Sequence, residues 1–233
     1  MRQIVLDTET TGIDPAQGHR VIEIGCVELI DRRLTGNHFH AYIQPERDVP
    51  KEVIEIHGIT NEFLQGKPVF NAVADDFFRY IEGAELVIHN APFDMGFLNN
   101  EYRLMRSRVA PLENHCSVLD TLYLARQKHP GQRNTLDALC KRYGIDNGHR
   151  TLHGALLDAE ILADVYLMMT GGQTSLSLVD EQGAAGEHQA ATMATTDVSE
   201  VVLSVIQPTA EEQAAHQDFL SRVLGLTDEP VSH

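Results

Sequence analysis

The sequence predicts an α/β fold in which helices pack on a mixed β-sheet, followed by a flexible C-terminal tail. Three observations lead to this prediction. Short apolar or alternating segments come first along the chain, helical periodicity dominates from residue 72 onward, and the composition changes beyond a double glycine at 171–172. Strands first, and then alternating strands and helices, are typical of a mixed sheet that is covered by helices.

Four strands are predicted in the first ninety residues. The first is a short apolar run that would be buried, and the second alternates well enough to form a strand. A third and a fourth follow, the last of them just before a helical segment. The predicted strands are 2–6, 21–30, 38–44 and 86–89.

Helical periodicity predicts five helices, at 72–81, 92–106, 119–128, 135–143 and 154–169. Pro92 fits the first turn of its helix, where a missing N–H costs nothing. Asn134, with Asp137 three residues later, resembles a capping arrangement. Gly171 and Gly172 are expected to end the last helix.

The C-terminal tail divides into three parts. Residues 179–200 are rich in Ala, Gln, Gly, Thr and Glu without a repeating apolar face, which predicts a disordered linker between the short segment 173–178 and the segment 201–233. In the last part, Thr209 and Glu212 form a capping box ahead of an apolar helical stripe. That part is too small to bury its own apolar face. It is therefore expected to dock on a partner or to pack back on the main domain.

Composition excludes two classes of protein. No stretch reaches the roughly 18–20 apolar residues of a membrane span, and Asp7 comes too early for a signal peptide. A cytoplasmic protein without membrane contact is therefore expected. The three cysteines are far apart in apolar settings, so they are expected to be buried reduced thiols.

The net charge of −16 argues against a free-standing nucleic-acid binder. From Gln173 onward the charge is −9, and residues 1–172 carry −7. Any affinity for nucleic acid would therefore come largely from a partner. Eight basic residues would form either a nucleic-acid path or a solvated face: Arg103, Arg106, Arg108, Arg126, Lys128, Arg133, Lys141 and Arg142.

Acidic residues stand at the ends of predicted elements. Asp7 and Glu9 follow the first strand, and strand alternation places both on one face. Asp94 falls in the first turn of a helix, where an acid also compensates the helix dipole. Asp158 adjoins the apolar stripe of the last helix, and a buried acid needs a partner. Taken singly, each has an ordinary structural explanation, such as a solvated turn for Asp7 and Glu9.

His153 precedes Gly154, so it is expected on the loop before the last helix, where a surface histidine is the alternative. Together the four acids make an all-oxygen set, which selects hard cations such as Mg²⁺ or Mn²⁺. Two such cations can clamp the oxygens of a phosphodiester, and a histidine can accept a proton from water near neutral pH.

Three stretches carry a resemblance to a known family: LDTETTG (6–12), HNAPFD (89–94) and HGALLDA (153–159). In this order they resemble the DnaQ-like 3′→5′ exonucleases with a histidine in the third motif, often called DEDDh. The resemblance covers nearly all of residues 1–175. It implies a ribonuclease-H-like fold with a five-stranded mixed sheet, two divalent cations, and the 3′ end of single-stranded or frayed DNA as substrate.

The resemblance also implies residue roles. Asp7, Glu9, Asp94 and Asp158 match the metal-binding acids, and His153 matches the general base. Thr11 and Gly12, together with Thr10, would bring backbone close to the terminal nucleotide. The positions that match substrate contacts or line the pocket are Asp7, Glu9, Thr10, Glu52, His57, His89, Asn90, Phe93 and Asp158.

Two partner segments are implied as well. Gln173, Leu176 and Leu178, within 173–178, resemble the motif by which replication proteins bind the sliding clamp. Segment 201–233 is similar to the family's tail that binds a polymerase catalytic subunit. Whether a further small subunit binds stays open. The alternatives are an RNA-trimming exonuclease of the same family and a non-catalytic scaffold that bridges clamp and polymerase.

Overall fold

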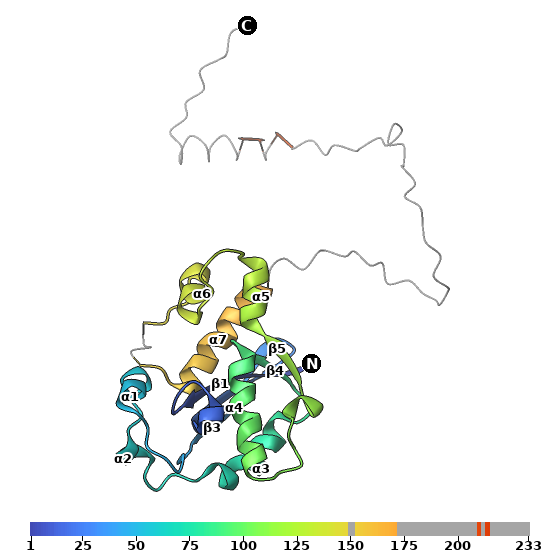
Figure 1. Cartoon of the computed structure of the whole chain (residues 1–233). Helices are drawn as coiled ribbons and strands as arrows, with labels where there is room; N and C mark the ends of the chain where they lie inside the picture. Colours follow the sequence, from blue (N-terminus) through green and yellow to red (C-terminus); the bar gives the residue numbers. More distant parts are fainter. Residues whose placement is uncertain (149–151, 172–208, 211–212, 215–233) are drawn as a thin grey trace, which may run out of the picture. The chain divides into compact units, whose positions relative to one another are not determined.

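A five-stranded sheet forms the centre of the fold in this computed structural model (Figure 1). The structure describes residues 1–148, 152–171, 209–210 and 213–214. The chain divides into two units, Met1–Leu178 and Val179–His233, and the sheet belongs to the first. The strand order is β3-β2-β1-β4-β5.

The sheet is mixed, as predicted. The strands are β1 (Arg2–Thr10), β2 (Val21–Ile30), β3 (Arg33–Tyr42), β4 (Glu85–Ile88) and β5 (Ser117–Asp120). β1, β2 and β3 pair antiparallel, whereas β4 and β5 extend the sheet in parallel beside β1. β3 begins before the predicted residue 38, because it pairs with β2 from the turn onward.

Seven α-helices occur among the described residues of the first unit. They are α1 (Lys51–His57), α2 (Asn61–Leu64), α3 (Phe70–Ile81), α4 (Ala91–Leu104), α5 (Thr121–Lys128), α6 (Leu136–Tyr143) and α7 (Ala155–Thr170). Short 3-10 turns lie at Pro15–Gln17 and Leu112–Asn114. The five predicted helices are confirmed within a few residues at each end.

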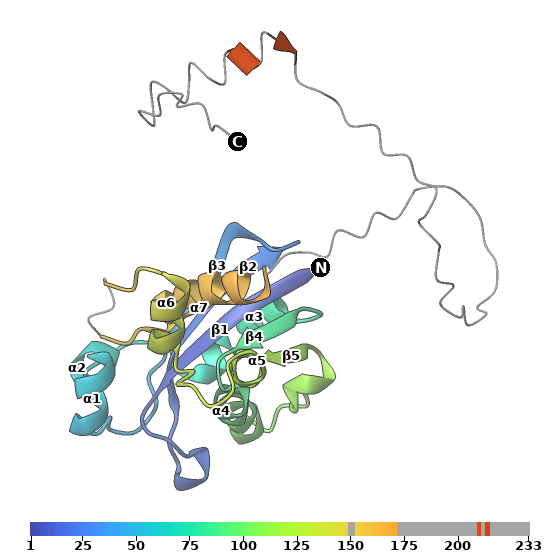
Figure 2. The same ribbon diagram turned by 90° about the horizontal axis from the view of Figure 1, so that it is seen from above.

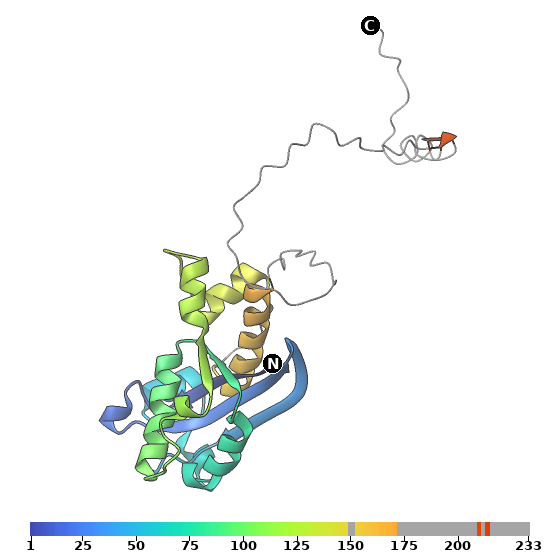
Figure 3. The same ribbon diagram turned by 90° about the vertical axis from the view of Figure 1, so that its right-hand side faces the viewer.

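Two faces of the sheet bury separate apolar layers. On one face Ile4 and Leu6 of β1 pack with α3 and α4. On the other, Val5 packs with Leu162 and Tyr166 of α7. Figure 2 shows α7 on one side of β1 and α3 and α4 on the other, and Figure 3 gives the side view with α7 in orange. Alternate β1 residues therefore face α7, which decides where Asp7 and Glu9 point.

Two predictions about helix starts are wrong. The helix expected from 119 begins at Thr121, because Leu119 and Asp120 pair with β4 as the end of β5. Thr135, and not Asn134, caps α6: its hydroxyl accepts from the Ala138 amide at 3.3 Å.

Asn134 instead stabilises the loop before α6, because its side-chain amide donates to the carbonyl groups of His129 and Gln132. Asp137 accepts from Asn147 at 3.1 Å. Pro92 does lie in the first turn of α4, and α7 ends at Thr170 with Gly171 as its C-cap.

The three cysteines are free and buried, as predicted. No helix in the described part of the chain is both long and apolar enough to cross a bilayer.

The predictions for Gln173, Leu176, Leu178 and the linker 179–200 fall outside the described residues, as does most of 201–233. In that last segment the Gln213 amide donates to the Thr209 carbonyl at 3.0 Å. This single bond has the spacing of an α-helical turn and lies where the helix start is predicted.

Candidate active site

A cleft of about 720 Å³ lies where β1, α4 and α7 meet. Its lining includes Asp7, Glu9, Asp94, His153 and Asp158. Three elements that are far apart in the sequence therefore bring these five side chains to one cleft. This convergence was the central expectation from the sequence.

The end of β1 sends its side chains to two sides. Asp7 and Glu9 are half-buried and share the face of the strand that packs against α7. Thr8 points the other way, and its hydroxyl donates to Asp94 Oδ1 at 2.6 Å. The regular pairing with β2 breaks between Glu9 and Thr10. β1 therefore includes both acids and ends at Thr10, and not at residue 6 as predicted, because Asp7 and Glu9 still pair with β2.

Asp94 is 3% exposed in the first turn of α4. Asn90 starts that helix in the left-handed conformation, with a φ of 69°. Burial raises the pKa of Asp94 to about 7, although hydrogen bonds from Thr8 and from the backbone act in the opposite direction. A buried carboxylate of this kind is stabilised in its charged form by a nearby cation.

Asp158 and His153 belong to the start of α7. Asp158 lies in the first turn and is 3% exposed, and His153 is on the preceding loop, as predicted. The His153 amide donates to the Ile56 carbonyl at 3.2 Å, and its Nδ1 lies 3.5 Å from Asp158 Oδ2. Leu152, next to His153 on the same loop, is half-exposed.

Glu9, His153 and Asp158 could hold a metal ion together. Each offers one ligand atom, and these atoms lie within 4.8 Å of one another. Asp7 and Asp94 add two more carboxylates to the same cleft. The donors are mostly oxygen, so the set fits a hard divalent cation.

The second motif forms one wall of the cleft. His89, Asn90 and Phe93 all line it, as expected. His89 Nδ1 lies 3.0 Å from the Thr121 hydroxyl, and burial lowers the pKa of His89. Asp120 braces the same wall: its Oδ1 accepts from the Asn90 amide at 3.1 Å and from the first turn of α5.

Three expected substrate contacts lie beside the cleft without lining it. Glu52 is exposed on α1, and His57 is buried at the end of that helix. Burial lowers the pKa of His57 to about 4, with a smaller contribution from the charge of His153. The Thr10 hydroxyl donates to the Gly12 carbonyl at 2.6 Å. Because the His153 amide is bonded to Ile56, α1 adjoins the site.

The wall continues beside His89 with residues that were not predicted as a group. Gln132, Asn134 and Arg126 contribute to it, and the Asn134 backbone lies next to His89. Arg126 is the one of the eight basic residues considered above that lines the cleft. Arg142 holds this wall by donating to Asn134 Oδ1 at 3.0 Å. The relevant signal in the sequence was weak, since Asn134 had been interpreted as a helix cap.

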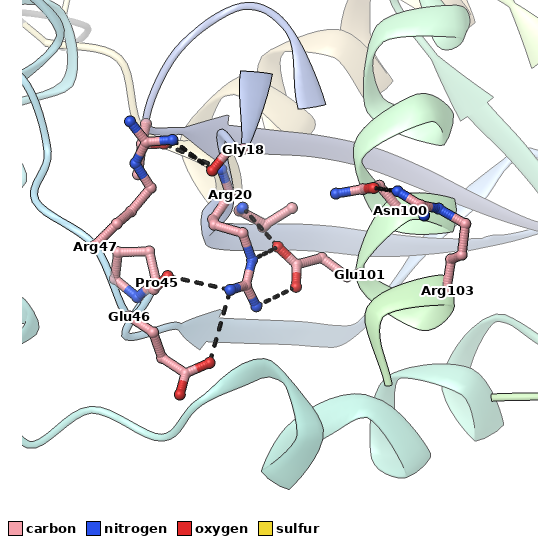
Figure 4. A network of polar contacts seen from close by, with 10 residues as sticks. Gly18, Arg20, Pro45, Glu46, Arg47, Asn100, Glu101 and Arg103 are labelled. Carbon is pink, nitrogen blue, oxygen red and sulfur yellow. Dashed lines mark hydrogen bonds and ion pairs between the residues drawn. The ribbon is translucent and has the colours of Figure 1, made fainter. Parts of the chain in front are cut away.

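The loop after β1 is fixed to α4 by a buried ion pair. The Arg20 guanidinium donates to both carboxylate oxygens of Glu101, at 2.8 and 2.7 Å. Glu101 is 1% exposed and also accepts from the Val21 amide. Figure 4 shows Glu101 reaching from α4 to Arg20, with Glu46 on the other side of the guanidinium. Thr11, at the start of the loop, bonds the Arg20 backbone.

The ion pair bears directly on the site. Glu101 is seven residues after Asp94, so both lie on one face of α4. That face is therefore held at two points, by Thr8 of β1 at its start and by Arg20 further along.

Comparisons with known proteins agree with this geometry. The RNase T exonuclease family matches residues 4–166. A Pasteurella multocida protein named DNA polymerase III subunit epsilon is 55% identical over 228 residues, which cover 94% of this chain and 88% of that protein. Its Escherichia coli K12 namesake is 52% identical over 226 residues, covering 95% and 93%.

Solved structures extend the likeness to the fold. Exonuclease X in complex with 5′ overhanging duplex DNA is 25% identical with a TM-score of 0.53, and the match covers 74% of this chain and 94% of that one. A 3′-exonuclease that recognises a histone mRNA stem-loop is 20% identical with a TM-score of 0.63, covering 73% and 64%. The latter shows a shared fold alone.

Proposed function

Because the chain belongs to the RNase T exonuclease family and, within it, to the epsilon subunits of DNA polymerase III, we propose that its cleft removes nucleotides from the 3′ end of newly synthesised DNA. It is a metal-dependent 3′→5′ exonuclease. The observation that carries the assignment of the site is the meeting of four carboxylates and one imidazole in a single cleft.

In this proposal Asp7, Glu9, Asp94 and Asp158 hold two divalent cations, Mg²⁺ or Mn²⁺. When bound, the cations stabilise the negative charge that develops on the phosphodiester oxygens. Burial of Asp94 and Asp158 supports this role, since a charged carboxylate in that setting calls for a counter-charge.

His153 is proposed as the general base. It stands on the loop before α7, half-exposed and within reach of water in the cleft. The imidazole accepts a proton from the attacking water as the water oxygen bonds to phosphorus and the P–O3′ bond to the preceding nucleotide breaks. The 3′ oxygen of the shortened strand takes up a proton from solvent, and a nucleoside 5′-monophosphate leaves. The short distance between His153 and Asp158 supports a fixed orientation of the ring.

The terminal nucleotide is proposed to lie along the walls of the cleft. Phe93 presents a half-buried ring there, which offers an apolar face for a base. His89 and Asn90 adjoin it. Glu52, His57 and the backbone at Thr10 complete the pocket from α1 and from the loop after β1. A mismatched end unpairs more readily, which by itself favours removal of errors.

Partners are proposed for the tail. Gln173, Leu176 and Leu178 would bind the sliding clamp, and 201–233 would bind the catalytic alpha subunit of the polymerase. A small theta-like subunit is a third candidate. The net charge of −16 supports this arrangement, because the polymerase would then supply most of the affinity for DNA. The protein would act in the cytoplasm, in the replisome on the nucleoid.

A cleavage assay tests the function. The wild-type chain should digest a single-stranded DNA oligonucleotide from its 3′ end with Mg²⁺ or Mn²⁺ and lose all activity in EDTA. Asp7→Ala should be inactive, because a cation ligand is missing. Asp164→Ala is the matched control, since Asp164 is an exposed acid on α7 away from the cleft and should leave the rate unchanged.

Three outcomes would count against the proposal. Full activity in EDTA would exclude a metal site, and preference for an RNA oligonucleotide of the same sequence would favour the RNA-trimming alternative. A chain that binds clamp and polymerase without turnover in Mg²⁺ would instead be a scaffold, a role that needs neither the acids nor His153.

A further inference from the structure

A carboxylate that the reaction scheme does not use lies beside Glu9. Glu23 of β2 is directly opposite Glu9 in the β1–β2 register, and Tyr42 of β3 is directly opposite Glu23. Paired residues of antiparallel strands point to the same face. Glu23 is therefore on the α7 side of the sheet, with the two acids of β1. It is 2% exposed and does not line the cleft.

The two oxygens of Glu23 are already engaged. Oε1 lies 2.7 Å from His40 Nε2, and the Tyr42 hydroxyl also bonds the carboxylate. Oε2 accepts from the Ala155 amide at 3.2 Å. A carboxylate whose oxygens are occupied by protein donors is poorly placed to bind a cation as well. Its role therefore differs from that of Glu9.

The Ala155 bond reaches the part of the site that is furthest away in the sequence. Ala155 is the first residue of α7, whose N-cap is Gly154 and has no side chain to bond the free amides. Glu23 of β2, 132 residues earlier in the chain, accepts from the Ala155 amide as the side chain of an N-cap residue would. Asp158 follows in the same turn, and His153 immediately precedes the cap.

A glycine next to Glu23 lets α7 approach β2 this closely. Gly25 is opposite Asp7 in the register. A Cβ built at Gly25 would lie 2.2 Å from the Ala155 carbonyl carbon and 2.2 Å from the Leu156 nitrogen. The first turn of α7 therefore rests directly on the β2 backbone, and the bond to Glu23 fixes where along β2 it rests.

We propose that Glu23 is a positioning residue for the metal site: by holding the first turn of α7 against β2, it sets Asp158 and His153 at the correct distance from Glu9. The proposal rests on the function proposed above in taking Glu9 and Asp158 as cation ligands. Residues that orient metal ligands typically contribute about 10–100-fold to metal affinity or activity.

Three substitutions in the full chain separate geometry from charge. Glu23→Met keeps the shape and removes every acceptor, so Mn²⁺ affinity, measured without substrate by electron paramagnetic resonance, should fall about 10–100-fold, with a matching loss of kcat on single-stranded DNA. Glu23→Gln loses the charge but can still accept from the Ala155 amide, so it should restore most of the affinity. Glu23→Asp keeps the charge, but its side chain is one methylene shorter and cannot reach the Ala155 amide as Glu23 does. It should therefore weaken Mn²⁺ binding, and of the three substitutions it should disturb folding least.

Glu28→Met is the matched control. Glu28 is another buried acid of β2, bonded to Arg2, Thr35 and Asn37 at the other end of the strand. It should lower thermal stability without changing Mn²⁺ affinity.

The proposal is overturned if Glu23→Asp binds Mn²⁺ as the wild type does while Glu23→Gln and Glu23→Met are equally weak, because charge alone would then explain the effect. It is also overturned if Glu23→Met changes stability alone, as Glu28→Met should. Asp158→Ala keeps the two questions apart: unchanged Mn²⁺ affinity in that variant would refute the proposed metal site itself.

Discussion

Burial divides the four carboxylates of the cleft into two pairs. Asp94 and Asp158 are 3% exposed, whereas Asp7 and Glu9 are half-buried at the end of β1. Within the buried pair, burial raises the pKa of Asp94. Binding of a cation in the cleft should therefore release a proton from Asp94 near neutral pH.

The raised pKa of Asp94 predicts how the metal-free protein responds to pH. The folded-state pKa of about 7 is above the usual value of 3.8, so the folded state binds a proton that the unfolded state releases. Through this group, the stability of the metal-free chain should therefore fall as pH rises from about 4 to about 7, by at most about 1.4 kcal/mol per pH unit. The lowered pKa of His57, about 4 in place of 6.5, acts in the opposite direction over most of this range, because there the unfolded state binds the proton.

Urea unfolding in EDTA across that pH range measures the effect. Because His57 titrates in the same range, the comparison is with Asp94→Asn, which should gain stability relative to the wild type as pH rises. Added Mn²⁺ should offset the wild-type loss near pH 7. A difference in stability between the two proteins that stays constant from pH 4 to 7 would contradict the assignment.

Replacement of His153 tests its role as the general base. His153→Ala should lower kcat by about 10²–10⁴, the usual share of a general base, with Mn²⁺ affinity retained. His38→Ala, a change at an exposed position on β3, is the control. One ring nitrogen of His153 also lies close enough to Glu9 and Asp158 to share a metal ion with them. A large loss of Mn²⁺ affinity in His153→Ala would therefore indicate that His153 is a metal ligand and not the general base.

Among the elements, α7 depends on a close approach to β2. Gly25→Ala would place a Cβ 2.2 Å from backbone atoms of Ala155 and Leu156. These atoms cannot move aside as a side-chain end can, so α7 should shift as a whole. A shift of about 1 Å can cost about 10²-fold in rate.

Steady-state kinetics of Gly25→Ala test this prediction. Gly96→Ala in α4 is the matched control, because an added Cβ there meets nothing within 4 Å. It should leave kcat unchanged. Equal activity of the two variants would mean that the contact between β2 and α7 does not set the site.

The ion pair between Arg20 and Glu101 holds α4 against the loop after β1. Glu101→Ala leaves the Arg20 guanidinium and the Val21 amide without their buried acceptor, so unfolding free energy should drop by about 3–5 kcal/mol. Asp76→Ala, which removes an exposed partner of Arg79, should change it by less than about 1 kcal/mol. Denaturant titration compares the two, and similar small losses would contradict the bracing role.

The sequence predicted the five longer helices and four of the strands, and missed the shorter elements. α3 has a clear apolar face, and α7 is buried along most of its length, so both carry many apolar residues over several turns. By contrast β5 has four residues, and its strand state comes from parallel pairing with β4. α1 has seven residues, of which His57 is the buried one, so it showed no periodic face.

The site was also predicted in part. Taken singly, Asp7, Glu9, Asp94, His153 and Asp158 had ordinary structural explanations, and their joint role was implied by the three motifs that resemble a known family. The structure brings these five side chains to one cleft. Glu23, Asp120 and Arg126 were not assigned a role at the cleft, because the effect of each depends on partners brought close by the sheet register or by α5.

The whole molecule combines a negative net charge with a nucleic-acid substrate. Of the eight basic residues considered above, Arg126 lines the cleft, so the isolated chain should neutralise few phosphates. The logarithm of its affinity for single-stranded DNA should fall with the logarithm of salt concentration with a slope of about −0.7 per contacted phosphate. We expect a slope near −1 for the chain alone and a steeper one for its complex with the polymerase subunit. A steep slope for the chain alone, unchanged in Arg126→Ala, would reveal another basic surface.

The distance in sequence between β1 and α7 has a consequence for protein synthesis. A ribosome makes Asp7 and Glu9 first and Asp158 some 150 residues later, and Glu23 cannot hold α7 until that helix has emerged. Nascent chains, and fragments ended by an early stop codon, therefore carry acids without the histidine and without the last carboxylate. A chain that stops before residue 153 should therefore lack a complete cleavage site.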